Sequence, residues 1–179
     1  MDFYLGIDIG TSRVKAVLFD QHFQACASAA QNTGPRLSAN GEAEQDMAQL
    51  WQSVVAILRD IARHPALQNG RLRAIGLAGQ GEGVWLCDAE GEPVGPGILW
   101  SDTRSRELMN ELLSRPGFDR RFFDDTGTHL QPCNTSMQLC WLKHHQPERP
   151  AICSSPRIGS AFASPASRRW ISPMPAPLC

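Results

Sequence analysis

The sequence lacks the features of several large protein classes. No stretch approaches the roughly 18 apolar residues that a membrane-spanning helix needs. The start of the chain has no basic segment followed by an apolar core, as a secretory leader has, so we expect no membrane partner and a cytoplasmic location. Lysine and arginine number 17 against 18 acidic residues, with no basic stripe, which argues against a nucleic-acid partner.

Cysteine pairs and the common nucleotide-binding signatures are also missing. Six cysteines occur without any C-x-x-C spacing, which fits neither a zinc site nor a disulfide framework and predicts reduced thiols. There is no G-x-G-x-x-G and no Walker-type loop with its lysine, so we expect neither a Rossmann nor a P-loop fold. With 179 residues and 42% apolar content, the chain can still bury the core of one domain.

The pattern of apolar residues predicts a mixed α/β fold. Two apolar runs, 4–8 and 14–19, flank a turn and predict a β-hairpin, with a third antiparallel strand at 23–30. Apolar residues recur every three or four positions from Asp46 to His64, which predicts an amphipathic helix capped by Asp46. We further expect a buried strand at 72–78, strands at 84–87 and 98–100, a helix from Asp102 or Thr103 to about Ser114, and a helix at 136–145.

The turn of the predicted hairpin carries groups that suit a phosphate. Gly10 lets the backbone come close to an anion, and Thr11 and Ser12 offer hydroxyl and N–H donors. Asp8 ends the first strand, where a carboxylate can hold Mg²⁺, usually through water. Lys15 can neutralise phosphate oxygens. A plain hairpin that happens to use these residues is the alternative.

The stretch LGIDIGTSRVKAVLFD resembles the phosphate-binding hairpin of the FGGY carbohydrate kinases, relatives of hexokinase, Hsp70 and actin. The resemblance implies an actin-like ATPase (ribonuclease H-like) fold, with an incomplete N-terminal domain at residues 1–149. It implies ATP and Mg²⁺ as cofactors, with a small sugar or polyol as substrate and a homodimer in the full-length family. The implied cofactor-binding residues, with Asp8 also at the metal, are Asp8, Gly10, Thr11, Ser12 and Lys15.

Two further segments, GLAGQGEGVWLCD and GPGILWSDTR, look like the sugar-binding part of the same family. By position, Gln80, Gly81 and Glu82 match loop residues that contact substrate hydroxyls. Trp100 matches a tryptophan that borders the sugar, and Asp102 and Arg104 continue that motif. The chemistry agrees, because a carboxylate accepts from hydroxyls and an indole face covers the apolar side of a polyol. Three alternatives stay open: a core Trp100, a merely solvated Glu82 and a helix-capping Asp102.

Departures from the family's patterns bear on the substrate. Gly81 stands where glycerol kinases have an arginine, and Gly81-Glu82 stands where xylulokinases commonly have Met-His. The segments look closer to the erythritol kinase and L-xylulose kinase branch, which implies ATP-dependent phosphorylation of a pentulose or a small polyol. The family's catalytic aspartate matches no residue here, so we expect an inactive fragment. A non-catalytic sugar- or nucleotide-binding remnant and another actin-like kinase are the alternatives.

Residues 150–179 differ in composition from the rest of the chain. They contain six prolines, three arginines and no acid, which predicts a disordered tail. Back-translating Ile152 to Leu178 and reading one base earlier gives, with permitted third bases, LFFSKDWLRFRLTGEPAVDISYAGTTL. That peptide resembles a Lys-Asp-Trp-Leu-Arg-x-x-Leu-Thr-Gly segment of the family. We therefore hypothesise a frameshift near residues 148–151 and an absent C-terminal kinase domain; a natural disordered tail is the alternative.

Overall fold

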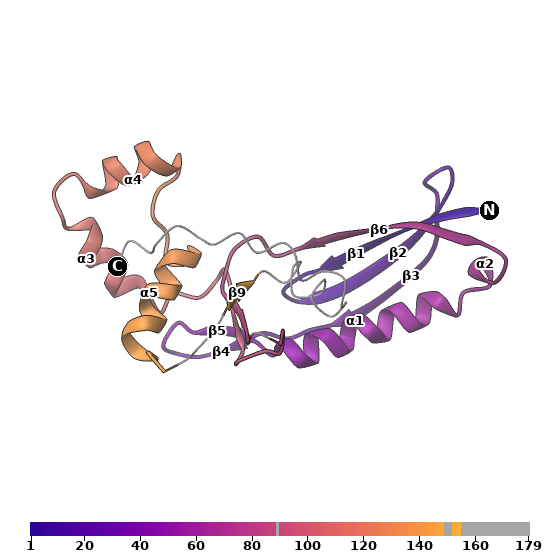
Figure 1. Ribbon diagram of the computed structural model, residues 1–179, viewed down its shortest axis with the longest axis horizontal. Helices are drawn as coiled ribbons and strands as arrows, with labels where there is room; N and C mark the ends of the chain where they lie inside the picture. Colours follow the sequence, from indigo (N-terminus) through magenta and orange to yellow (C-terminus); the bar gives the residue numbers. More distant parts are fainter. Residues whose placement is uncertain (89, 149–151, 155–179) are drawn as a thin grey trace.

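The computed structural model describes residues 1–88, 90–148 and 152–154. Its larger sheet has four strands in the order β3-β2-β1-β6, drawn at the right of Figure 1. The first three strands run antiparallel, whereas β6 runs parallel to β1 after helix α1 has crossed over. Their bounds are β1 Asp2–Ile9, β2 Arg13–Asp20, β3 Ala25–Asn32, α1 Met47–Ala62 and β6 Arg71–Gly79. The predicted hairpin, third strand and mixed sheet are confirmed.

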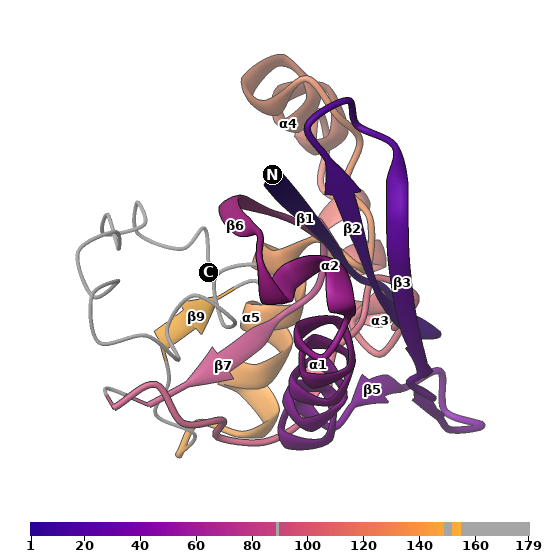
Figure 2. The ribbon, with the colours of Figure 1, turned by 90° about the vertical axis from the view of Figure 1, so that its right-hand side faces the viewer.

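Helix α1 packs along one face of this sheet, as Figure 2 shows from the end. Alternate residues of β1 and β2 are buried there, because successive side chains of a strand point to opposite faces. The core cluster joins strand and helix residues, among them Leu5, Ile7, Val14, Val54 and Ile57. Asp46 caps the helix as predicted, since its carboxylate accepts a hydrogen bond from the backbone N–H of Gln49 at 2.9 Å.

Strand β6 corrects the expectation of a buried strand. Its residues are exposed along most of its length, and Leu72, Ile75 and Leu77 are 40%, 53% and 41% exposed. Within the described ranges β6 is an edge of the sheet, and α1 packs against β2 and β3 instead. A short apolar strand is buried only where another element covers it. Tertiary contacts decide whether such an element is present, and the local sequence does not show them.

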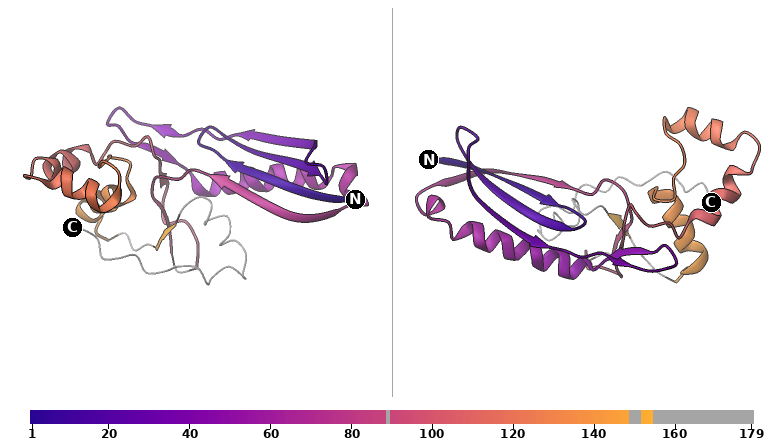
Figure 3. Two further views of the ribbon diagram at one scale, coloured as in Figure 1. Left: turned by 90° about the horizontal axis from the view of Figure 1, so that it is seen from above. Right: turned by 180° about the vertical axis from the view of Figure 1, so that it is seen from behind.

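The remaining elements form two small sheets and a group of helices (Figure 3). One sheet has the order β4-β5-β8, and β7 pairs with β9. Helices α3, α4 and α5 lie at the end of the molecule opposite the N-terminus. The bounds are β4 Arg36–Leu37, β5 Ala43–Gln45, α2 Pro65–Gln68, β7 Trp85–Cys87, β8 Gly97–Ile98, α3 Arg106–Leu113, α4 Phe118–Thr126, α5 Thr135–His145 and β9 Ile152–Ser154.

One helical prediction needs correction, and one helix was missed. Helix α3 begins at Arg106 with Ser105 as its N-cap residue, so neither Asp102 nor Thr103 caps it. Helix α4 was not predicted, because its sequence FDRRFFDDT is mostly polar and none of its residues is buried. It is delimited instead by Gly117 and Gly127, whose φ angles of 71° and 73° are the left-handed conformation that glycine adopts readily.

The chain's cysteines and its tail also differ in part from expectation. Cys26 and Cys133 carry free thiols as predicted, but Cys140 is disulfide-bonded. Strand β9 lies within the segment expected to be disordered, whereas residues 150, 151 and 155–179 of that prediction lie outside the described residues. Among the helices of the described chain, none has the length and apolar character needed to cross a membrane.

Candidate nucleotide and sugar site

The turn between β1 and β2 is held in a tight, defined conformation. The Gly10 N–H donates to the Arg13 carbonyl at 3.0 Å, and a Cβ at Gly10 would lie 2.9 Å from that oxygen, so the turn needs glycine. Thr33 braces the turn from the end of β3, because its hydroxyl donates to the Thr11 carbonyl at 3.2 Å and its N–H to the Ser12 carbonyl at 2.9 Å. These hydrogen bonds fix the shape of the turn.

Asp8 and Lys15 face each other across the β1–β2 pair, on the side of the sheet opposite the α1 core. Both side chains are exposed, and among the described residues the Asp8 carboxylate makes no hydrogen bond or ion pair. No cluster of three or more potential metal ligands occurs in the described ranges.

Trp100 lies directly beside the turn. Its indole N–H donates to the Thr11 hydroxyl at 3.1 Å, although 89 positions separate the two residues. The side chain is 54% exposed, so the interpretation of Trp100 as a core residue is wrong. The exposed indole instead lies next to the β1–β2 turn.

The Gln80 to Glu82 loop reaches the same turn through Gln45, a residue that the sequence analysis missed. The Gln80 side-chain amide donates to Gln45 Oε1 at 3.2 Å, and Gln45 Nε2 donates to the Thr11 carbonyl at 3.0 Å. Gly81 and Glu82 are exposed, and a Cβ at Gly81 would meet nothing within 4 Å. The buried Gln80 thus connects the loop to the turn, whereas Gly81 and Glu82 at the tip of the loop are open to solvent.

Cys133 is a second residue that the sequence analysis did not assign to the site. Burial raises the pKa of the Cys133 thiol, and the negative charge of Glu82 raises that pKa further. The Thr135 hydroxyl donates to the Gly83 carbonyl at 3.0 Å, which places the start of α5 beside the Gln80 to Glu82 loop.

Asp102 lies in the interior, away from the exposed tip of the site. It is 1% exposed, and its carboxylate accepts from the Ala43 N–H at 2.7 Å and from Arg104 Nη2 at 2.8 Å. Arg104 in turn donates to Glu44 at 2.8 Å and lies 5.1 Å from the Trp141 ring centroid. Burial acts to lower the pKa of Arg104, but its hydrogen bonds to Asp102 and Glu44 outweigh that effect and leave the pKa raised.

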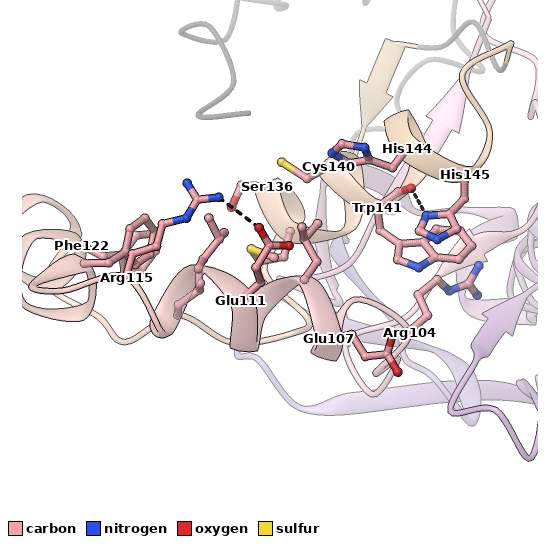
Figure 4. Close-up of a pocket in the computed structure, with 15 residues that line it drawn as sticks. Arg104, Glu107, Glu111, Arg115, Phe122, Ser136, Cys140, Trp141, His144 and His145 are labelled. Atoms are coloured by element: carbon pink, nitrogen blue, oxygen red, sulfur yellow. Dashed lines mark hydrogen bonds and ion pairs between the residues drawn. The ribbon is translucent and has the colours of Figure 1, made fainter.

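A separate pocket of about 560 Å³ lies among α3, α4 and α5 (Figure 4). Arg104 and Trp141 stand at one end, and an ion pair of 3.3 Å joins Arg115 to Glu111. Among the residues named for the phosphate and the sugar, all of which lie in the described ranges, Arg104 alone lines this pocket. The candidate site is instead the open junction of the β1–β2 turn, the Gln80 to Glu82 loop and Trp100.

Comparison with known proteins assigns most of the chain to the carbohydrate kinase family that its motifs resemble. Residues 3–154 match the model of the FGGY family of carbohydrate kinases, N-terminal domain. The chain is 34% identical over 164 residues to a probable L-xylulose kinase of Pasteurella multocida, covering 92% of this chain and 33% of the relative. It is 36% identical over 148 residues to an erythritol kinase of Brucella abortus, covering 82% of this chain and 28% of that protein.

Solved structures agree with these sequence matches. A crystal structure titled as a xyloylose kinase from Brucella ovis superposes with a TM-score of 0.77 at 32% identity, covering 87% of this chain and 32% of that one. A xylulose kinase from Rhodospirillum rubrum gives a TM-score of 0.82 at 25% identity, covering 89% and 33%. The actin-like ATPase fold is confirmed, and the chain spans about a third of the length of these relatives.

Proposed function

Because the chain belongs to the FGGY family of carbohydrate kinases, we propose that it forms the phosphate- and sugar-binding part of an ATP-dependent kinase for a small sugar or polyol. The reaction moves the γ-phosphoryl group of ATP to a substrate hydroxyl, and a cytoplasmic location belongs to the same proposal. Such transfers depend mainly on positioning and on charge stabilisation, not on covalent catalysis. The residues of this chain supply positioning groups for both reactants.

The observation that carries the proposal is the hydrogen bond of 3.1 Å between the Trp100 indole and the Thr11 hydroxyl. It joins the turn suited to a phosphate to the side chain suited to a sugar face. On the nucleotide side, Gly10, Thr11 and Ser12 offer donors, Lys15 adds positive charge and Asp8 would hold Mg²⁺ with its unpaired carboxylate. Mg²⁺ would there neutralise charge on the phosphates.

On the substrate side, Gln80 and Glu82 offer acceptors to hydroxyl groups, Gly81 leaves room at the loop tip, and Trp100 covers an apolar sugar face. We assign Asp102 to support of this segment, because its buried carboxylate is already bonded to Ala43 and Arg104. The relatives named L-xylulose kinase and erythritol kinase favour a pentulose or a four- to five-carbon polyol as the substrate.

We also propose that the chain by itself binds ligands without ordinary turnover, since no carboxylate of the chain is assigned as the base for the substrate hydroxyl. Another actin-like kinase outside this family is excluded by the family match. A non-catalytic remnant that binds sugar or nucleotide is the second candidate, because the β1–β2 turn and Trp100 offer binding groups without an assigned base. A normal phosphorylation rate with L-xylulose or erythritol would contradict both the proposed inactivity and this candidate.

Titration calorimetry with L-xylulose, erythritol and Mg-ATP tests the binding proposal. Trp100→Ala should weaken sugar binding by about tenfold, since an aromatic face contributes on the order of 1 kcal/mol beyond its buried area. Trp51→Ala is the matched control, because Trp51 is 41% exposed on α1 and contacts no site residue through a hydrogen bond. A folded chain that binds neither sugar, or that binds equally after both substitutions, would refute the proposal.

The tail is a separate proposal, namely that residues 150–179 are encoded out of frame. Sequencing the DNA from about codon 140 onward decides it. The proposal expects the peptide SKDWLRFRLTGE in the adjacent frame. A different peptide in that frame would contradict it and would favour a natural tail.

A further inference from the structure

We propose that Gln45 is a positioning residue that joins the two halves of the site and fixes which group Gln80 presents to the substrate. The inference rests on the proposed function and extends it to a residue outside the predicted site. Gln45 is 2% exposed and ends strand β5, immediately before the residue that caps α1. Its side chain lies between the β1–β2 turn and the Gln80 loop.

Both polar atoms of the Gln45 side-chain amide form hydrogen bonds. Nε2 donates to the Thr11 carbonyl at 3.0 Å, and Oε1 accepts from Gln80 Nε2 at 3.2 Å. A side-chain amide is planar, so its donor and acceptor are held in a fixed relation to each other. The turn and the loop are therefore tied together through one rigid group, 34 and 35 positions from its partners.

The chemistry of Thr11 sets the direction of this chain of hydrogen bonds. A backbone carbonyl only accepts, so Gln45 must turn its NH₂ toward Thr11 and its oxygen toward Gln80. Gln80 must then donate through its NH₂, which turns its own Oε1 away from Gln45. That oxygen is buried and has no hydrogen-bond partner among the described residues. Gln80 consequently offers an acceptor, which suits the O–H of a sugar or polyol.

The backbone that carries Gln45 is itself anchored. Asp102 accepts from the Ala43 N–H at 2.7 Å, and Arg104 donates to Glu44 at 2.8 Å. Gln45 also pairs with Gly97 of β8 in the antiparallel β5–β8 ladder. These contacts hold the backbone of Gln45 in place. The buried Asp102–Arg104 pair thus supports the site by fixing the strand that carries Gln45.

The test compares Gln45→Met, which keeps side-chain length but removes both hydrogen bonds, with Gln52→Met on the exposed face of α1 as the control. Amide hydrogen exchange of the full chain without ligand is the first measurement. Gln45→Met should speed exchange at residues 10–13 and 80–83 by about tenfold, the loss expected from one hydrogen bond, and Gln52→Met should not. Unchanged exchange at either segment would overturn the inference.

Calorimetry with L-xylulose and erythritol is the second measurement, on Gln45→Met, Gln80→Met and the double variant. If Gln45 acts through Gln80, the double variant binds no more weakly than Gln80→Met alone. Independent losses that multiply would overturn the positioning role. A wild-type chain that binds neither sugar while Gln45→Met still loosens both segments refutes the proposed function and keeps the link between turn and loop.

Discussion

Asp102 provides the sharpest test of the site's support, because its carboxylate is completely buried. The side chain is 0% exposed, and its partner Arg104 is 5% exposed. Asp102→Ala would leave the Ala43 N–H without its acceptor and would remove one of two carboxylates from the guanidinium. Asp102→Asn would keep an acceptor oxygen for Ala43 but would remove the charge.

Breaking a buried ion pair from one side costs about 3–5 kcal/mol, because the remaining charge stays buried. Arg104 keeps its hydrogen bond to Glu44 and its position over the Trp141 ring, which places Asp102→Ala at the lower end, about 3 kcal/mol. Asp102→Asn should cost about 2 kcal/mol, the range for a hydrogen bond to a charged group. For a domain of this size those losses lower the melting temperature by roughly 4–12 °C.

Thermal unfolding followed by circular dichroism measures these shifts. Asp124→Asn is the matched control, since the Arg120–Asp124 pair of 2.9 Å is exposed at 82% and 50% of its side-chain surfaces. An exposed pair contributes less than about 1 kcal/mol, so this variant should melt within about 3 °C of the wild type. If the melting temperature of Asp102→Asn falls no further than that of Asp124→Asn, Asp102 does not stabilise the fold as a buried ion-pair partner.

Three further predictions follow from burial, backbone conformation and charge. Ile57→Ala should cost about 2–5 kcal/mol by urea unfolding, whereas Ile75→Ala, at a side chain 53% exposed, should cost under about 1 kcal/mol; equal losses would contradict the exposed β6 edge. Gly83→Ala should destabilise the chain by more than about 1 kcal/mol and weaken sugar binding. The reason is that φ of Gly83 is +103° and the added Cβ would lie 2.4 Å from the Ile98 carbonyl oxygen. An unchanged melting temperature would refute this loop geometry. Burial and the negative charge of Glu82 raise the pKa of the Cys133 thiol above its ordinary value, so alkylation followed by mass spectrometry should be slow at neutral pH and faster in Glu82→Gln; an identical pH profile in that variant would contradict the influence of Glu82.

The elements that the sequence predicts well are those set by local patterns. The β1–β2 hairpin depends on two apolar runs around Gly10, and α1 depends on a three- and four-residue repeat that Asp46 caps. The family resemblance rests on the same local stretches. These features require no knowledge of which distant segments come together.

What the sequence could not predict depends on contacts between distant residues. Gln45 belongs to the site through partners 34 and 35 positions away, and nothing in its own neighbourhood marks it. Asp102 looks like an exposed substrate ligand in its motif, yet it is buried because β5 brings the Ala43 N–H to its carboxylate. The exposure of β6 likewise depends on what covers the strand, which an apolar run such as 72–78 does not encode.

We propose that the β1–β2 turn, the Gln80 to Glu82 loop and Trp100 form one binding site. Chemical-shift mapping of the isotope-labelled chain during titration with L-xylulose, and then with Mg-ATP, tests it most directly. We expect L-xylulose to shift the signals of residues 80–83 and of the Trp100 indole N–H together with the Thr11 amide, and Mg-ATP to shift those of residues 8–15. Sugar-induced shifts confined to the pocket among α3, α4 and α5, with Trp100 and Thr11 unchanged, would show that the sugar does not bind at this site.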